Sequence, residues 1–413
     1  MTHKIAIVGA GQAGMPLALS LLAAGRDVTL VTNRTADDVR RGKVMSSQCL
    51  FGTSLQIERD ANLDFWEQEC PLIEGIGLTV PHPEQPGQKL IDWAARLDRP
   101  AQSVDQRLKL SDWMDLFTHR GGKLEVKEVG IGELEHLTAT HDLVVVAAGK
   151  GDVVKLFERD EARSPYQAPQ RTLALTYVHG MAPRTPYSRV CFNLIPGIGE
   201  YFVFPALAPS GPCEIMVFEG IPGGPMDCWD DVRTPRAHLQ RSLSILQTFL
   251  PWEHARCADV ELTDANGVLA GRVTPAVRKP VGRLPSGRLV FGMADAVTVN
   301  DPITGQGSNN AVKAFKVVNE AIQQRGDAPF DAAWMQATFD RCWDDARHAT
   351  RWTNMLLAPP PPHILNLLGA AGQCPPIASV IANCFDQPKD LFPWWADPAV
   401  CEAFIADHMA VPA

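Results

Sequence analysis

The sequence predicts an α/β fold in which a domain built on a parallel sheet carries an inserted antiparallel β-rich domain and a helical C-terminal region. Three patterns indicate this fold: a glycine-rich turn between a strand and a helix near the N-terminus, four strand-like segments between about residues 170 and 220, and helical periodicity from residue 311 onward. The 413 residues correspond to about two or three structural units, at roughly 150 residues per domain.

The composition is that of a globular chain, and it disfavours several classes of function. Hydrophobic residues make up 46% and charged residues 21% of the chain, and 38 Lys and Arg against 47 Asp and Glu give a net charge of −9. This acidic balance disfavours sequence-independent binding to nucleic acids or to anionic lipids, because both depend on a basic surface. No stretch approaches the roughly 20 apolar residues of a membrane span.

The cysteines and the N-terminus indicate where the protein works. Ten cysteines occur without any C-x-x-C pair, and the histidines show no H-x-x-x-H spacing, so we expect reduced thiols and no metal site. Only Met1 to Lys4 precede the first apolar run, and a glycine-rich turn follows it at once, which leaves no room for a secretory signal. We therefore expect a cytoplasmic protein.

A dinucleotide-binding unit opens the chain. The run Lys4–Val8 predicts a buried parallel strand, residues 15–24 a helix, and Asp27–Thr32 a second strand. In a Rossmann-like G-x-G-x-x-G turn, the first glycine permits the turn, the second lets the backbone approach a pyrophosphate, and the third lets helix and strand pack closely. The helix N-terminus then offers free N–H groups to phosphate oxygens. Between the first strand and the helix, this turn comprises Gly9, Ala10, Gly11, Gln12, Ala13 and Gly14.

The end of the second strand departs from the usual pattern. An acidic residue that holds an adenosine ribose is common there, whereas this chain has Thr32, Asn33 and Arg34. The guanidinium of Arg34 is suited to a phosphate. We include all three residues in the cofactor site and expect the ribose to be recognised differently.

A second cofactor-binding segment follows the substrate region. A strand at residues 286–293 leads to Asp295, and a Pro- and Gly-rich turn then opens a helix. Asp295 is placed to accept hydrogen bonds from a polyol such as a ribityl chain, and the turn offers backbone N–H groups to the electron-rich pyrimidine edge of a flavin. We therefore predict FAD as the cofactor. The residues assigned to it here are Asp295, Pro302, Gly305, Gln306, Gly307, Ser308 and Asn309.

The elements between these two segments suggest a division into domains. We expect a helix from the N-cap Ser111 to Gly121-Gly122 and a buried strand at residues 143–148. Further strands are expected at residues 172–178, 189–194, 200–204 and 213–218, and helices at about 235–250, 311–324 and 333–357. We assign residues 1–45, 85–165 and 270–330 to a discontinuous FAD-binding domain, 46–84 and 166–269 to a substrate-binding domain, and 331–413 to the C-terminal helical region.

Both cofactor segments resemble those of a known family. Gly9–Gly14 and the D-P-x-x-G-Q-G-S-N-N segment at residues 301–310 are similar to FAD-dependent aromatic monooxygenases of the hydroxybenzoate-hydroxylase fold. Within that fold the chain resembles, almost end to end, the two-component styrene/indole monooxygenases. Shared features include Thr32–Arg34, Gln106–Leu108 and the D-L-V-V-V strand at residues 142–146.

This resemblance implies an oxygenase subunit. Such a subunit receives reduced FAD from a separate NAD(P)H-dependent flavin reductase, forms a 4a-hydroperoxyflavin with O2 and epoxidises an apolar aromatic alkene, commonly as a homodimer. Because the flavin hydroperoxide does the chemistry, no acid–base residue is expected. The resemblance also implies FAD contacts at Arg107 and at Lys43, where the family usually has Arg; Lys43 keeps the charge but loses the bidentate fork.

The resemblance extends to the residues that face the substrate. Ser46, Gln48 and Leu50 alternate, so an extended strand would place them on one face, and Ile73 and Ile76 would add apolar wall. Their pattern is similar to that of the indole-preferring branch, with Leu50 where that branch usually has Met. Gln48 or Ser46 would accept the N–H of indole. The expected product is indole epoxide, which opens to indoxyl and oxidises to indigo.

Four other interpretations are considered at this point. A styrene-preferring epoxidase of the same family would differ in its relative rates on styrene and indole. A single-component NAD(P)H-dependent hydroxylase is disfavoured because Ala148–Asp152 lacks the Asp-Gly motif of those enzymes, and a halogenase because no W-x-W-x-I-P segment is present. A non-catalytic FAD-binding redox protein would bind flavin without an oxygen-dependent product.

Overall fold

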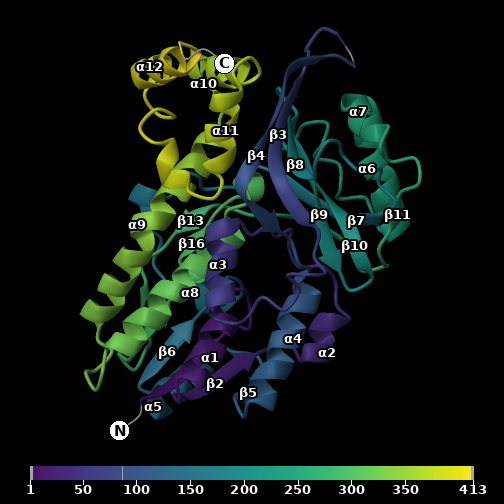
Figure 1. The fold of residues 1–413 in the computed structure, drawn as a ribbon. Coiled ribbons are helices and arrows are strands. Elements are labelled where there is room, and N and C mark those ends of the chain that lie inside the picture. Colours follow the sequence, from purple (N-terminus) through teal and green to yellow (C-terminus); the bar gives the residue numbers. More distant parts are fainter. Residues whose placement is uncertain (1–2, 86, 411–413) are drawn as a thin grey trace.

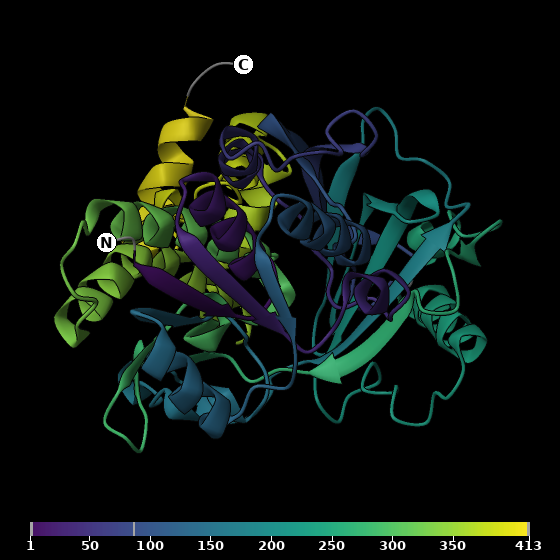
Figure 2. The same cartoon turned by 90° about the horizontal axis from the view of Figure 1, so that it is seen from below.

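The structure, a computed structural model, describes residues 3–85 and 87–410. Residues 1–2, 86 and 411–413, which fall within the domain ranges expected from the sequence, lie outside the described residues. Two large sheets organise the fold, and helices α10 (Pro362–Ala371), α11 (Pro375–Asn383) and α12 (Pro398–Met409) lie together at one end (Figure 1). Viewed from below, the two sheets lie side by side (Figure 2).

The first sheet is Rossmann-like. Its six strands follow the order β14-β15-β6-β1-β2-β5; every neighbouring pair is parallel except β14 and β15. Such a sheet buries both faces, which explains why β1 and β6 are continuous apolar runs. The strands are β1 (Lys4–Val8), β2 (Asp27–Thr32), β5 (Lys123–Val126), β6 (Leu143–Val146), β14 (Val281–Arg283) and β15 (Leu289–Gly292). The expected βαβ unit is confirmed.

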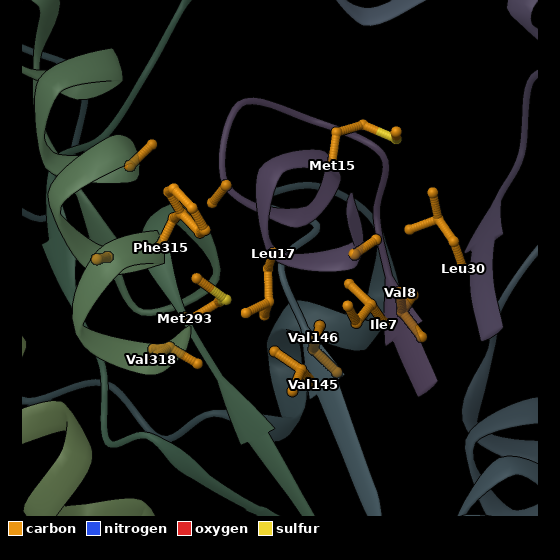
Figure 3. Close-up of a cluster of buried hydrophobic side chains, with 14 of the residues drawn as sticks. Ile7, Val8, Met15, Leu17, Leu30, Val145, Val146, Met293, Phe315 and Val318 are labelled. Carbon is orange, nitrogen blue, oxygen red and sulfur yellow. The ribbon is translucent and has the colours of Figure 1, made fainter. Parts of the chain in front are cut away.

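Helices enclose this first sheet in one hydrophobic core. Helix α1 (Gly14–Ala23) is apolar on nearly all sides, since it lies between β1 and helix α8 (Gly307–Gln324). Figure 3 shows Leu17 of α1 beside Val145 and Val146 of β6, with Phe315 and Val318 of α8 turned toward the same cluster. The other helices of this half are α2 (Ala36–Arg40), α3 (Gly52–Asp60), α4 (Gln106–His119) and α5 (Ile131–Thr140).

The second sheet is mostly antiparallel, as the strand pattern predicted. Its order is β11-β7-β10-β9-β8-β3-β4, with β12 also paired to β7, and only β3 and β8 run parallel. The strands are β3 (Leu72–Pro81), β4 (Lys89–Gln102), β7 (Thr172–His179), β8 (Arg189–Ile195), β9 (Gly199–Ala208), β10 (Gly211–Gly220), β11 (Glu261–Leu262) and β12 (Val268–Arg272). Helices α6 (Pro235–Phe249) and α7 (Pro251–His254) cover its outer face (Figure 1). A separate short pair joins β13 (Ala276–Val277) to β16 (Thr298–Val299).

Strand β4 lies in a different sheet from the one expected. The predicted FAD-binding range 85–165 includes it, but β4 forms a hairpin with β3 in the second sheet. Along β4, the buried residues Trp93, Ala95 and Leu97 alternate with exposed ones, which is the pattern of an antiparallel strand with one covered face. The return to the first half therefore comes after Gln102, at α4.

Helix α4 also begins earlier than expected. Asp105 is its N-cap and accepts the N–H of Arg107 at 2.8 Å, whereas Ser111 lies inside the helix. The Ser111 hydroxyl donates to the carbonyl of Arg107 at 2.7 Å, one turn back. A serine before an apolar run thus resembled a cap, but the true cap was the aspartate six residues upstream.

The C-terminal helices share a second core with the second sheet. Helix α11 packs on β4, and Trp352, Phe385 and Trp395 lie in the core cluster that also holds Ile73 and Ile76. The helices are α9 (Ala332–Leu356), α10 (Pro362–Ala371), α11 (Pro375–Asn383) and α12 (Pro398–Met409). In residues 3–85 and 87–410, no single helix is long and apolar enough to cross a membrane; α10 and α11, bent by 114°, meet that criterion only as a pair.

Candidate functional site

The glycines of the first turn differ in what surrounds them. A Cβ on Gly14 would lie 1.9 Å from the carbonyl oxygen of Gly9, and one on Gly9, whose φ is 113°, would lie 2.8 Å from the backbone nitrogen of Ala148. A Cβ on Gly11 would meet nothing within 4 Å. Gly9 and Gly14 therefore allow close packing, while Gly11 faces open space.

The start of α1 presents unused backbone donors to that space. In the described part of the chain, the first N–H after the turn to be bonded to backbone is that of Met15, which donates to the carbonyl of Gly11 at 3.1 Å. The N–H groups of Gln12, Ala13 and Gly14 make no such bond. Three free donors at the positive end of a helix fit the charge of a pyrophosphate.

The side chain of Gln12 has a structural partner. Its Nε2 donates to Oε1 of Glu58 at 2.5 Å, and Nζ of Lys109 donates to the other oxygen of Glu58 at 2.7 Å. All three side chains are buried, and burial raises the pKa of Glu58 although Lys109 opposes the rise. This network fixes the turn to α3 and α4, so the predicted cofactor contact of Gln12 rests on its backbone.

Asp295 lies where β15 and β6 end together. A Cβ on Gly149 would come within 2.4 Å of Cβ of Asp295, so only glycine permits this contact. The preceding residue, Ala294, adopts a φ of 49°, which costs energy in a non-glycine residue and turns the next side chain outward from the strand. Asp295 is exposed, but the protein around its carboxyl desolvates it and raises its pKa to about 6, although Lys150 opposes the rise.

The turn before α8 combines open glycines with engaged side chains. Asp301 caps the short 3-10 helix η4 (Pro302–Thr304), and Gly305 follows in the left-handed region at φ 65°. A Cβ on Gly305 or Gly307 would meet nothing within 4 Å. The amide of Gln306 donates to the carbonyl of Phe385 at 2.9 Å, which holds the turn against the C-terminal region. Ser308 is half-buried in the first turn of the helix.

Asn309 ties this turn to the substrate-facing segment. Its Oδ1 accepts the N–H of Phe51 at 3.0 Å, and its Nδ2 donates to the carbonyls of Cys49 at 2.8 Å and Gly305 at 3.0 Å. These bonds satisfy the amide, so this side chain positions two loops.

The three basic residues predicted to contact FAD differ in whether a carboxylate already pairs with them. Among the described residues, neither Arg34 nor Lys43 has a carboxylate within 4 Å, and Arg34 lies beside the sulfur of Met45. Arg107 instead is buried and forms ion pairs with Asp105 at 2.8 Å and Asp264 at 3.0 Å. Charge complementarity therefore favours Arg34 and Lys43 as phosphate ligands, whereas the FAD contact predicted for Arg107 would have to compete with two carboxylates.

The remaining strand-end residues are at the surface. Thr32 is half-buried, and exposed Asn33 donates to a carboxylate oxygen of Glu128 at 3.2 Å. Both flank the first turn at the carboxyl ends of the parallel strands, where ligands of such sheets bind.

Ser46 and Gln48 belong to a hydrogen-bonded group that includes Tyr177 of β7. The Tyr177 hydroxyl donates to the carbonyl of Ser46 at 2.8 Å, Gln48 Nε2 donates to that hydroxyl at 3.4 Å, and Ser46 Oγ donates to Gln48 Oε1 at 3.3 Å. Gln48 and Tyr177 are buried. The sequence analysis missed Tyr177; the available signal was the one tyrosine in a strand otherwise made of Thr, Leu, Ala, Val and His.

The apolar residues predicted to line the substrate site divide between two cores. Ile73 and Ile76 are fully buried in the second core; a bulge between Ile73 and Gly75 lets residues three apart share that side of β3. Leu50 packs in the first core and pairs with Gln102 as an isolated bridge. Residues 43–49 before it form no strand, so the expected strand there was wrong.

Two cavities lie near these residues without being lined by Ser46, Gln48, Ile73 or Ile76. One of about 50 Å³ lies between Asp295, α8 and α9; the other, about 390 Å³, opens between Trp66, α4 and the β9–β10 turn. Among the described residues, no group of three or more His, Cys, Asp or Glu side chains is placed to hold a metal ion.

One protein-family model and two related proteins match the sequence of the chain. Residues 149–256 match the family described as a styrene monooxygenase A substrate binding domain. The chain is 29% identical over 409 residues to "Styrene monooxygenase StyA" of Pseudomonas fluorescens and equally so to the protein of that name from Pseudomonas sp; each alignment covers 96% of both chains.

Solved structures share the fold at low sequence identity. The flavin-dependent brominase Bmp2 superposes with a TM-score of 0.69 at 14% identity and covers 99% of both chains. The p-nitrophenol 4-monooxygenase PnpA from Pseudomonas putida DLL-E4 gives a TM-score of 0.65 at 14% identity, covering 94% of this chain and 98% of that one. Over nearly its full length, the chain is thus similar in sequence to proteins named styrene monooxygenase StyA, and it shares its fold with the brominase Bmp2 and the monooxygenase PnpA.

Proposed function

We propose that the chain is an oxygenase component that uses externally reduced FAD and O2 to epoxidise indole, and also styrene-like aromatic alkenes. The observation that carries the choice of indole is the buried amide of Gln48, which Ser46 and Tyr177 hold in one orientation. The names of the related proteins support styrene as the alternative preferred substrate.

The described residues fit FAD at two places. Gly11, Gly305 and Gly307 leave open space beside backbone, and the free N–H groups at the start of α1 would receive the pyrophosphate, together with Arg34 and Lys43. Asp295 would accept hydrogen bonds from the ribityl chain. When bound in its reduced form, FAD supplies the activation of O2. The protein binds and orients the reactants and excludes water from them.

The substrate side offers an apolar wall and one acceptor. Ile73 and Ile76 are completely buried and would contact an aromatic ring. Gln48 Oε1 accepts only the long bond from Ser46 among the described residues, which leaves acceptor capacity for the N–H of indole. Styrene has no such donor. A buried polar group that pairs with one substrate and not with another is a strong source of discrimination.

The test supplies purified protein with chemically reduced FAD, O2 and either substrate. We expect oxygen-dependent formation of indoxyl and then indigo, with a higher initial rate on indole than on styrene. Gln48→Met, which keeps the volume but removes the acceptor, should lower the indole-to-styrene rate ratio about tenfold, equivalent to one hydrogen bond of about 1.4 kcal/mol. Hydrogen peroxide as the sole product would refute the oxygenase proposal, and a rate ratio unchanged by Gln48→Met would refute the role of Gln48.

The partners are part of the same proposal. We expect a separate NAD(P)H-dependent flavin reductase, a cytoplasmic location and a homodimer. NAD(P)H without a reductase should then support no turnover, while addition of a flavin reductase should restore it. Turnover with NADH or NADPH alone would instead favour a single-component hydroxylase, and light scattering measures the oligomeric state.

A further inference from the structure

A pair of buried carboxylates joins the second sheet to the turn before α8. Glu219 of β10 and Asp301 are both 0% exposed. Neither oxygen of Glu219 has a hydrogen-bond partner among the described residues, and neither has Oδ2 of Asp301. Oδ1 of Asp301 accepts the N–H of Ile303 at 3.1 Å, so the opposite oxygen remains for another contact. The Glu219 carboxyl lies within hydrogen-bonding reach of the Asp301 carboxyl.

The positively charged side chain near this pair, Arg171, already forms an ion pair with a different carboxylate, Glu200. Glu200 lies directly opposite Glu219 in the β9–β10 ladder, and Arg171 binds both oxygens of Glu200, at 2.6 and 2.9 Å. Arg171 faces the pair but makes no hydrogen bond to it. Tyr166 also faces Asp301, with its hydroxyl donating to the carbonyl of Asn354 at 2.8 Å. Glu219 and Asp301 therefore receive no donor from these neighbours.

Two adjacent carboxylates in a protein interior are not both ionised when no hydrogen-bond donor or cation lies between them. The cost of two uncompensated charges far exceeds the cost of retaining one proton, and a carboxyl–carboxylate hydrogen bond satisfies both groups. Burial raises the pKa of both carboxyls. The charge of Asp301 raises the pKa of Glu219 further, well above its ordinary 4.5, whereas the hydrogen bond with Glu219 lowers that of Asp301, so the proton resides mainly on Glu219. The same arrangement of like charges produces shared protons in other paired acids.

We propose that Glu219 and Asp301 share one proton and that this proton fastens the turn at residues 301–307 to the second sheet, so that its loss loosens the turn and weakens FAD binding. The step is a simple ionisation: the O–H bond of the shared carboxyl breaks, the proton passes to solvent, and two carboxylates remain. The effect on FAD binding rests on the proposed function, whereas the shared proton does not. Glu219 is thus a positioning residue that acts through Asp301.

The first test measures the shared proton in the protein without flavin. A raised carboxyl pKa stabilises the fold fully below its ordinary value, and this stabilisation is lost as pH rises through the raised value. The free energy of unfolding of the wild type should therefore fall more steeply with pH than that of Glu219→Gln, by up to one bound proton. Asp301→Asn should remove the same proton, so the double variant should show the slope of either single variant. Additive slopes, or a wild-type slope equal to that of Glu219→Gln, would overturn the shared proton.

The second test measures the affinity for oxidised FAD by flavin fluorescence across the same pH range. Wild-type affinity should fall by up to about tenfold per pH unit once the shared proton is lost, whereas Glu219→Gln should lack this decline and keep only the pH dependence of the other groups, such as Asp295. Glu214→Gln is the matched control, because burial raises the pKa of this carboxyl on the same strand to about 7 but it does not contact Asp301. A pH dependence retained in Glu219→Gln, or lost in Glu214→Gln, would refute the link to the turn. Absence of FAD binding at every pH would refute the cofactor site instead, while the unfolding measurements would still decide the shared proton.

Discussion

The cofactor side and the substrate side of the candidate site are built by different means. On the cofactor side, space is made by missing side chains, at Gly11, Gly305 and Gly307, next to backbone held by Gly9 and Gly14. On the substrate side, the surface is made by side chains from distant segments, such as Gln48 and Tyr177, 129 residues apart. Backbone geometry thus fixes the cofactor side, whereas single side-chain changes are able to retune the substrate side.

The largest expected effect is a loss of stability on replacing Arg107, which pairs with Asp105 at the start of α4 and with Asp264 beside the second sheet. Replacement by Met leaves the buried carboxylate of Asp105 without its cation and should lower the free energy of unfolding by about 3–5 kcal/mol. The matched variant Arg34→Met removes an arginine without a carboxylate partner and should cost less than about 0.5 kcal/mol. Urea unfolding measures both. Equal losses would contradict the division between structural and cofactor-facing arginines.

The next effect separates two glycines of the same turn. Gly14→Ala places a Cβ against the carbonyl of Gly9 and should destabilise the fold by about 3 kcal/mol, because backbone rather than a flexible side chain must move. Gly11→Ala has room and should change stability by less than about 0.5 kcal/mol. Urea unfolding measures the stability of both variants. If Gly11→Ala were as unstable as Gly14→Ala, the open space beside Gly11 would be absent.

Cofactor affinity should respond in a different order. Gly11→Ala fills space assigned to the pyrophosphate, and Arg34→Met removes a phosphate partner, so each should weaken FAD binding about tenfold, or about 1.4 kcal/mol. Flavin fluorescence titration measures this. Arg236→Met is the control, since this exposed arginine of α6 also lacks a carboxylate partner among the described residues. If it weakens binding as much, general electrostatics and not a local contact would explain the loss.

The smallest effect tests the substrate side. Tyr177→Phe removes one hydroxyl that holds Ser46 and Gln48, and it should cost about 1 kcal/mol of stability while lowering the indole-to-styrene ratio of kcat/KM several-fold. Tyr201→Phe is matched to it: Tyr201 is fully buried in the same sheet, but its hydroxyl has no partner among the described residues. That control should leave the ratio unchanged. A similar shift in both variants would point to general loosening of the sheet.

The features that could be predicted from the sequence lie mainly on the cofactor side of the site, and those that could not depend on contacts between distant segments. The G-x-G-x-x-G turn and the strand leading to Asp295 are local patterns whose backbone requirements appear in adjacent residues, and the structure brings both to the carboxyl ends of the first sheet. Contacts between distant segments were beyond reach: the pairing of β4 with β3, the hydroxyl of Tyr177 and the carboxyl of Glu219 depend on tertiary packing. For β4 and for Asp105 a signal existed in the sequence, in the apolar residues Trp93, Ala95 and Leu97 set among Asp92, Arg96 and Asp98, and in an N-cap residue.

The side chain of Asn309 has a thermodynamic consequence. Because it bonds both Gly305, in the turn proposed to contact the flavin, and the backbone on either side of Leu50, a movement of one loop strains the other. Binding that orders one loop therefore lowers the entropy that remains to be lost at the second. By linkage, any factor by which substrate tightens flavin must equal the factor by which flavin tightens substrate. Through the Asn309 amide, the affinity for flavin and the affinity for substrate would therefore depend on each other.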